Sequence, residues 1–151
     1  MGKEYLNRIL ALLLVFLFSV SNNAQIISGA DLLFSENLNL IAEKNVGVVC
    51  NHTSLLSDGT HLVDALIEQK DVTVKAIFTP EHGFKGSAEA GEKLDYKNNL
   101  YKEVPIISLY GKDRKPSKDN LKDIDVLIFD IQDVGARFYT YISTMYYVLE
   151  A

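Results

Sequence analysis

Polar side chains that could act as acids, bases or ligands follow three apolar segments of the sequence. These segments are 46–50, 72–78 and 126–131, and the residues that follow or end them are Asn51, His52, Thr53 and Ser54, then Pro80, Glu81, His82 and Gly83, then Asp130, Gln132, Asp133, Gly135 and Arg137. Carboxylates and imidazoles are the usual groups of general acid–base catalysis. The pattern predicts one site that is assembled from three loops.

Glu81 is the leading candidate for a catalytic acid. A proline of fixed φ, Pro80, lies between the apolar segment and this carboxylate, so its position is rigid. Partial desolvation there would favour the protonated carboxyl group and let it donate a proton near neutral pH. The alternative is that Glu81 caps a turn by accepting backbone N–H groups.

Several neighbours of Glu81 are candidates for supporting roles. His82 could assist the catalytic acid, bind a metal ion or serve only the structure, and His52 has the same alternatives. Asp130 and Asp133 stand at the end of the most hydrophobic segment, where a carboxylate needs a partner. Either Asp133 or Asp130 could be a second catalytic carboxylate, and Asp130 is also a candidate for substrate binding.

Four further residues or segments are candidates for binding a substrate. Asn51 and Thr53 follow the first apolar segment, and Tyr139 lies in the predicted first turn of the last helix, nearest the site. Arg137, four residues after Asp133, could pair with it across a helical turn or bind the substrate. The basic segment 112–115 could contact an anionic substrate or be an ordinary solvated loop.

The hydrophobic pattern predicts the elements that position these side chains. Continuous apolar runs at 46–50, 72–78, 104–109 and 126–131 are typical of strands buried on both faces. Helices are predicted at 28–33, at 60–69 with Thr60 as the N-cap, at 117–122 with Ser117 as the N-cap, and from Ala136 onward. His61, at a helix start, is expected to be exposed.

Strands that alternate with helices predict a parallel, doubly wound, Rossmann-like α/β sheet. The carboxyl ends of parallel strands meet at one edge of such a sheet, so the three polar loops should lie together. The segment 81–102 carries three glycines and no clear periodicity, and a loop of this length inside a domain is usually either functional or disordered.

The first 24 residues predict a secretory signal peptide. Lys3 and Arg8 precede an uncharged apolar run at 9–18, and Ala24 is a suitable cleavage position. That run is shorter than the ~20 apolar residues that a membrane span needs, so no stable membrane insertion is expected after cleavage. The mature part, 25–151, ends within a helical pattern without a cap, which predicts an incomplete N-terminal domain whose C-terminal domain is absent. Export to the periplasm or the extracellular space follows.

The charge balance disfavours nucleic acid as a partner. Without its first 24 residues the chain has 13 basic and 19 acidic residues, which gives a formal charge of −6. The sequence also lacks a glycine-rich phosphate loop after the first predicted strand, a nucleophile elbow and an HExxH motif. Standard nucleotide binding and zinc-protease chemistry are therefore disfavoured.

Four motifs carry a resemblance to a known family. They are Pro80-Glu81-His82-Gly83, Ala90-Gly91-Glu92, Ser108-Leu109-Tyr110-Gly111 and Asp130-Ile131-Gln132-Asp133-Val134-Gly135-Ala136-Arg137-Phe138-Tyr139-Thr140-Tyr141. Together they resemble the bacterial exo-β-N-acetylmuramidase family of glycoside hydrolases, from about residue 40 to the end. Members of that family are roughly two to three times longer than this chain.

The resemblance implies a Rossmann-like domain followed by a second domain, with muramyl sugars from peptidoglycan bound in the cleft between them. It implies that Glu81 is the catalytic glutamate and that His82, Asp133, Arg137 and Tyr139 lie near the pocket, with no cofactor and no metal. Glycosidic hydrolysis needs a proton donor and usually a second carboxylate. A metal-dependent hydrolase that uses the histidines and carboxylates, and a carbohydrate-binding module without turnover, are the two alternative functions.

Overall fold

The computed structural model describes residues 2–9, 26–89 and 100–151 of the chain. Residues 2–9 are helical, while the rest of the predicted signal segment, residues 1 and 10–24, lies outside the described residues. Within the described ranges, no helix combines the length and the apolar character that crossing a bilayer requires.

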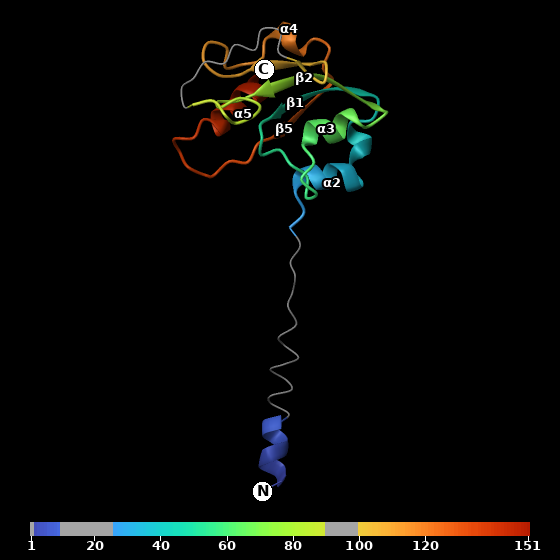
Figure 1. The fold of residues 1–151 in the computed structure, drawn as a ribbon, viewed down its shortest axis with the longest axis vertical. Helices are drawn as coiled ribbons and strands as arrows, with labels where there is room; N and C mark the ends of the chain where they lie inside the picture. Colours follow the sequence, from blue (N-terminus) through green and yellow to red (C-terminus); the bar gives the residue numbers. More distant parts are fainter. Residues whose placement is uncertain (1, 10–25, 90–99) are drawn as a thin grey trace.

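A five-stranded sheet forms the centre of the domain (Figure 1). Its strands are β1 (Lys44–Cys50), β2 (Val72–Thr79), β3 (Leu100–Tyr101), β4 (Val104–Ser108) and β5 (Val126–Asp130), in the spatial order β3-β4-β2-β1-β5. Strands β1, β2, β4 and β5 run parallel, and only the short β3 pairs antiparallel with β4. The chain leaves β1 toward β2 and β4 and later returns to place β5 on the other side of β1.

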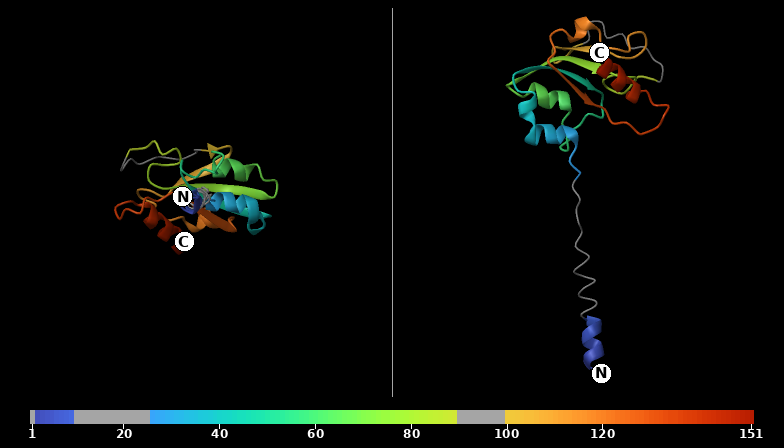
Figure 2. Two further views of the ribbon diagram at one scale, coloured as in Figure 1. Left: turned by 90° about the horizontal axis from the view of Figure 1, so that it is seen from below. Right: turned by 180° about the vertical axis from the view of Figure 1, so that it is seen from behind.

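Helices lie on both faces of this sheet, because side chains alternate between the two faces along each buried strand. The helices are α2 (Gly29–Glu36), α3 (Leu62–Ile67), α4 (Lys118–Leu121) and α5 (Tyr141–Glu150), with a 3₁₀ turn, η1, at Leu38–Leu40. One core contains α2 and α3 against Val46, Val48 and Ile77; the other contains Leu121 of α4 and Val148 of α5 against Val49 and Phe78. Figure 2 shows α2 and α3 on one side of the strands and α5 on the other. The predicted doubly wound α/β fold is therefore confirmed.

Local capping agrees with the prediction at α4 and differs from it at α3. Ser28 caps α2 by accepting from the backbone N–H of Asp31, and Ser117 forms a capping box with Asn120 at α4. At α3 the N-cap is His61 rather than Thr60, because the ring nitrogen Nδ1 of His61 accepts from the backbone N–H of Val63 at 3.2 Å.

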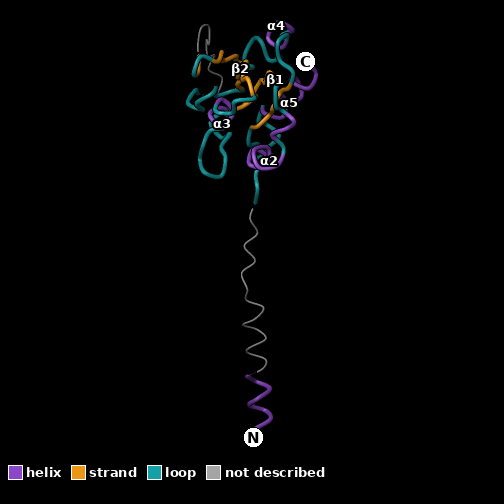
Figure 3. The backbone as a smooth tube through the Cα atoms, turned by 90° about the vertical axis from the view of Figure 1, so that its right-hand side faces the viewer, coloured by secondary structure: helices purple, strands orange, loops and turns teal. Residues whose placement is uncertain are grey.

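The last helix begins five residues later than the sequence pattern predicts, at Tyr141 rather than at Ala136. Gly135 adopts a φ of +69°, and its N–H donates to Oδ1 of Asp133 at 2.6 Å, so a turn interrupts the apolar periodicity. The N–H of Tyr139 then donates to the carbonyl of Ala136 in a second turn. Tyr139 consequently precedes the first helical turn instead of lying in it. Figure 3 shows in teal how much of the chain between the strands is loop.

Gly47 of β1 leaves room for side chains that pack over the strand. A Cβ atom added there would lie 2.6 Å from Cδ2 of Leu127, 2.9 Å from Cδ1 of Ile124 and 3.1 Å from Cε2 of Phe78. The pairing of β1 with β2 shifts its register between Val46 and Gly47. A side chain at this position would therefore displace the side chains of Leu127 and Ile124.

Gly47→Ala should therefore destabilise the fold by about 1–3 kcal/mol, which is the usual cost of inserting a methyl group into a packed core. The free energy of unfolding from denaturant titration measures this cost. Gly29→Ala is the control, because a Cβ atom at Gly29 has no atom within 4 Å. Equal stability of the two variants would show that the side chains of Leu127 and Ile124 move aside without cost.

Candidate functional site

The loops at the carboxyl edge of the sheet are tied together by hydrogen bonds, as the parallel topology predicts. The Ser54 hydroxyl, after β1, donates to the carbonyl of Asp130 in β5, and the N–H of Gln132 donates to Oγ1 of Thr53 at 3.2 Å. The N–H of Leu109 donates to the carbonyl of Thr79 at 2.8 Å, which joins the ends of β4 and β2. The end of each parallel strand is thereby fixed against a neighbour.

Glu81 lies at the centre of this edge, directly after β2 and the fully buried Pro80. The hydroxyl of Thr140 donates to Oε2 of Glu81 at 2.9 Å. A hydrogen bond to the same carboxylate is the main reason that the pKa of Tyr110 is raised, followed by desolvation and the negative charge of Glu81. Two hydroxyl groups, from the loop after β4 and from the start of α5, thus orient the carboxylate.

Thr140 directs its hydroxyl toward Glu81 instead of toward its own helix. It is the N-cap residue of α5, yet its side chain makes no capping hydrogen bond. Threonine at this position ordinarily accepts from a backbone N–H of the first turn. The helix therefore gives up a stabilising cap, and Glu81 gains a fixed partner from a distant part of the sequence.

Glu81 and Thr140 line a pocket of about 220 Å³, together with His82, Phe138, Tyr139 and Tyr141. The ring centroids of Phe138 and Tyr139 are 5.5 Å apart, and those of Tyr139 and Tyr141 are 6.0 Å apart in an edge-to-face arrangement. Phe138 is 84% exposed, so its ring is available to a ligand. The pocket combines one oriented carboxylate with aromatic surfaces. We name it the Glu81 pocket.

His82 occupies a backbone conformation that disfavours residues other than glycine, with φ at +69°. Its Nδ1 lies 2.8 Å from the carbonyl oxygen of Ala88, and a carbonyl only accepts, so Nδ1 carries the proton. In the neutral ring, Nε2 is then an acceptor. Strained residues of this kind cluster at functional sites, where the surrounding structure holds them in place.

Part of the loop after β1 is buried. Asn51 is fully buried, and its Oδ1 accepts from both the N–H and the hydroxyl of Thr53, at 2.9 and 2.7 Å. The Thr53 hydroxyl in turn accepts from Gln132. The structure therefore places Asn51 and Thr53 in the connection between β1 and β5, outside the residues that line the Glu81 pocket.

The two aspartates of the β5 end have different surroundings. Burial raises the pKa of Asp130, and the charge of His61 opposes this shift. Asp133 is exposed and accepts from the N–H of Gly135. The charges of Glu81 and Asp133 both help to raise the pKa of Tyr141, after the larger effect of burial, so both carboxylates lie near the Tyr141 hydroxyl.

The predicted alternative in which Arg137 pairs with Asp133 is wrong. The two residues are not on one helix, and no ion pair joins them among the described residues. Arg137 is exposed and is not among the residues that line the Glu81 pocket.

His61 is a structural residue that the sequence did not reveal, since it was expected to be exposed. Its Nε2 donates to the carbonyl of Asn51 at 2.9 Å, while Nδ1 accepts the N–H that caps α3. Its ring contacts Phe84 edge to face at 5.0 Å, and Phe84 packs on Tyr101 at 4.9 Å. His61 thus supports the loop after β1 and the long loop after Glu81 at the same time.

The far end of that long loop is also attached to α3. The hydroxyl of Tyr101 donates to Asp64 at 2.9 Å, and Lys102 forms an ion pair with Asp64 at 2.7 Å. The hydrogen bonds and the charge of Lys102 outweigh partial burial and lower the pKa of Asp64. Residues 90–99 of the loop lie outside the described residues, and with them the motif at Ala90.

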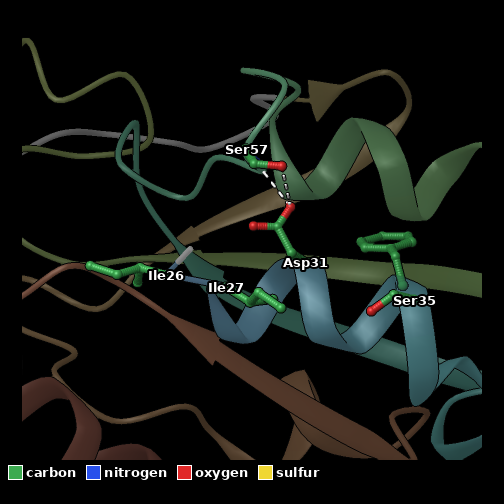
Figure 4. A pocket seen from close by; sticks show the side chains of 6 residues that line it. Ile26, Ile27, Asp31, Ser35 and Ser57 are labelled. Carbon is green, nitrogen blue, oxygen red and sulfur yellow. Dashed lines mark hydrogen bonds between the residues drawn. The ribbon is translucent and has the colours of Figure 1, made fainter. Parts of the chain in front are cut away.

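A larger cavity of about 430 Å³ lies elsewhere, beside α2 (Figure 4). Its walls include Ile26, Ile27, Phe34 and the carboxylate of Asp31. Oδ1 of Asp31 accepts from the N–H and the hydroxyl of Ser57, both at 2.9 Å. This carboxylate joins α2 to the loop after β1, and hydrogen bonds, first from Ser28, lower its pKa.

The residues that the structure describes contain no cluster of three or more His, Cys, Asp or Glu side chains with the geometry of a metal site. Cys50 is buried at the end of β1, and this burial raises the pKa of its thiol. It is therefore a packing residue.

The fold and site together define a doubly wound α/β domain with a carboxylate-bearing, aromatic pocket at the carboxyl edge of its sheet. Residues 46–151 match the family model described as the N-terminal part of the exo-β-N-acetylmuramidase NamZ, so the chain belongs to this family. The resemblance drawn from the sequence motifs is thereby confirmed.

Two relatives show how much of a family member the chain represents. The peptidoglycan β-N-acetylmuramidase NamZ of Bacillus subtilis (strain 168) is 42% identical over 124 residues, which cover 82% of this chain and 30% of the relative. The crystal structure of a DUF1343 family protein from Bacteroides fragilis superposes with a TM-score of 0.72 at 39% identity, again over 82% of this chain and 30% of the other. The chain therefore spans less than a third of either relative.

Asp130→Asn should raise the free energy of unfolding at neutral pH. A carboxyl group whose pKa is raised by folding costs stability while it is ionised, and this cost disappears below its ordinary pKa of 3.8, where the folded and unfolded states are both protonated. The gain should therefore be largest near pH 7 and vanish as the pH falls toward 3.8.

Denaturant titrations at several pH values measure this difference. Asp123→Asn, at an exposed aspartate after α4, is the control and should change stability by less than about 0.5 kcal/mol. A loss of stability in Asp130→Asn, or a gain that does not depend on pH, would mean that the fold compensates the charge of Asp130.

Proposed function

We propose that this chain forms the catalytic-acid half of an exported glycoside hydrolase that removes terminal β-linked N-acetylmuramic acid from peptidoglycan fragments. The observation that carries the proposal is the position of Glu81, which two hydroxyl groups orient at the mouth of an aromatic pocket. The relative in Bacillus subtilis, a peptidoglycan β-N-acetylmuramidase, supports the substrate class.

Glu81 acts in this proposal as the general acid that protonates the glycosidic oxygen. The Thr140 hydroxyl suits both protonation states of that acid, because a hydroxyl group donates to a carboxylate and accepts from a carboxylic acid. The carboxyl group therefore keeps its orientation while it loses and regains the proton. The aromatic rings of Phe138 and Tyr139 provide the apolar surface on which a sugar ring would lie.

Asp133 is proposed as the second carboxylate of the reaction. Its exposure gives it access to water, and the Asp133–Gly135 turn fixes its side chain at the same edge of the sheet as Glu81. A carboxylate in this role either activates water or attacks the sugar directly, depending on its distance from the acid. His82, which lines the same pocket and whose Nδ1 is held by the carbonyl of Ala88, is proposed to assist Glu81.

Glu81→Gln should lower kcat about 10²- to 10⁴-fold in the protein expressed from its complete reading frame, because the Gln amide has no acidic proton to transfer. Release of nitrophenol from a β-N-acetylmuramide, with circular dichroism as the check on folding, measures this loss. Glu36→Gln, at the exposed end of α2, is the matched control and should retain wild-type turnover.

Near-wild-type turnover by Glu81→Gln would exclude this residue as the acid. The relatives are matched over only 30% of their length, so residues 1–151 alone are expected to show no turnover.

We also propose that the chain is exported. The support is the charged and apolar pattern of residues 1–24, and the mature protein should begin near Gln25. Mass spectrometry of protein recovered outside the cytoplasm identifies that terminus. Leu14→Arg, which puts a charge inside the apolar run, should leave unprocessed protein in the cytoplasm. An exported protein that keeps its first 24 residues would contradict the proposed cleavage.

A further inference from the structure

A second cavity, of about 200 Å³, adjoins the Glu81 pocket. Its lining includes Tyr110, Arg114, Thr140, Ser143 and Tyr147, and we name it the Arg114 cavity. Thr140 lines both cavities, and Tyr110 and Thr140 are the residues whose hydroxyl groups contact Glu81. Because Thr140 lines both cavities, a ligand bound at Glu81 would lie next to the Arg114 cavity.

Arg114 provides the positive charge of this cavity. Its Nε donates to the carbonyl of Gly111 at 3.4 Å, which leaves the two terminal amino groups of the guanidinium for other partners. Among the described residues, Arg114 forms no ion pair with a carboxylate. Its charge acts on the Tyr110 hydroxyl and partly offsets the effects that raise the pKa of Tyr110.

The other cations of this region are placed differently. Lys115 pairs with Glu150 at 3.3 Å, so its charge already has a partner. Lys112 and Arg137 are exposed, as Arg114 is, but they line neither the Glu81 pocket nor the Arg114 cavity. Arg114 is thus the basic residue that the described structure places in a cavity beside Glu81.

We infer that Arg114 binds the lactyl carboxylate of the terminal muramyl residue and so selects N-acetylmuramic acid over N-acetylglucosamine. The inference rests on the proposed function and names the residue that determines its specificity. The two sugars differ by the lactyl ether, whose carboxylate is an anion of a size that a cavity of 200 Å³ admits. Guanidinium and carboxylate form paired, charge-assisted hydrogen bonds, and Ser143, which also lines the cavity, has a hydroxyl group that can donate.

The test compares two substrates on the protein expressed from its complete reading frame. One is a nitrophenyl β-N-acetylmuramide with a free lactyl carboxylate, and the other is its lactyl methyl ester, which has no charge. Arg114→Gln should lower kcat/KM for the acid about 10- to 100-fold, the range for losing a hydrogen bond to a charged group, and leave the ester unchanged. Arg114→Lys should restore part of the preference for the acid.

Two further variants make the outcome specific. Lys118→Gln removes a positive charge from the exposed start of α4, away from both cavities, and should leave both substrates unchanged. Arg137→Gln should do the same. An equal loss on acid and ester in Arg114→Gln, no loss at all, or an acid-selective loss in Arg137→Gln would each overturn the inference. Wild-type protein that hydrolyses neither substrate would instead contradict the proposed function, so the two failures are distinguishable.

Discussion

The hydrogen bond between Thr140 and Glu81 is the contact on which the site depends. It joins the loop after β2 to the start of α5 and so connects residues that are 59 positions apart in the sequence. Without it, the carboxylate would lose one of the two hydroxyl groups that orient it. In return, the N-cap side chain of α5 makes no capping hydrogen bond. The loss of such a bond typically lowers the stability of a protein by about 1 kcal/mol. A local sacrifice of stability at a functional position is common in enzymes.

The parallel sheet explains why such a contact can form at all. The register of β1 against β2 and β5 brings the carboxyl ends of these strands to one level, and the lack of a side chain at Gly47 leaves room for the Leu127 side chain of β5. The loops then bond to one another instead of to solvent. One side of the edge is structural, with Asn51, Thr53 and His61 joining β1, β5 and α3. The other side holds Glu81 and the two cavities.

Much of this organisation was predictable from the sequence, because strands buried on both faces leave continuous apolar runs and short helices leave caps. The four parallel strands, the cap at Ser117 and the convergence of polar loops follow from such local signals. The start of α5 could not be predicted in this way. The helical spacing of apolar residues continues through 136–140, and it does not reveal the turn that Asp133 and Gly135 form. The two-residue β3 is too short to leave a pattern.

The partners of Glu81 were also beyond the reach of sequence reasoning. Tyr110 belongs to a recognisable motif, but nothing in that motif shows that its hydroxyl contacts a glutamate after another strand. Thr140 falls inside the helix that the sequence predicts, and His61 resembles an exposed histidine, until the tertiary contacts are known. Side-chain pairs between separate loops depend on strand order, which is a property of the whole fold. The choice of Arg114 among the basic residues near the site depends on the same information.

The central claim is that Glu81 donates the proton to the glycosidic oxygen, and a crystal structure with a bound ligand tests it most directly. The ligand would be a disaccharide with a terminal N-acetylmuramic acid, bound to the Glu81→Gln variant of the complete protein. We expect the bridging oxygen within about 3 Å of the side-chain amide at position 81, with the sugar ring against Phe138 and Tyr139. A disaccharide bound with its bridging oxygen away from position 81 would contradict the account.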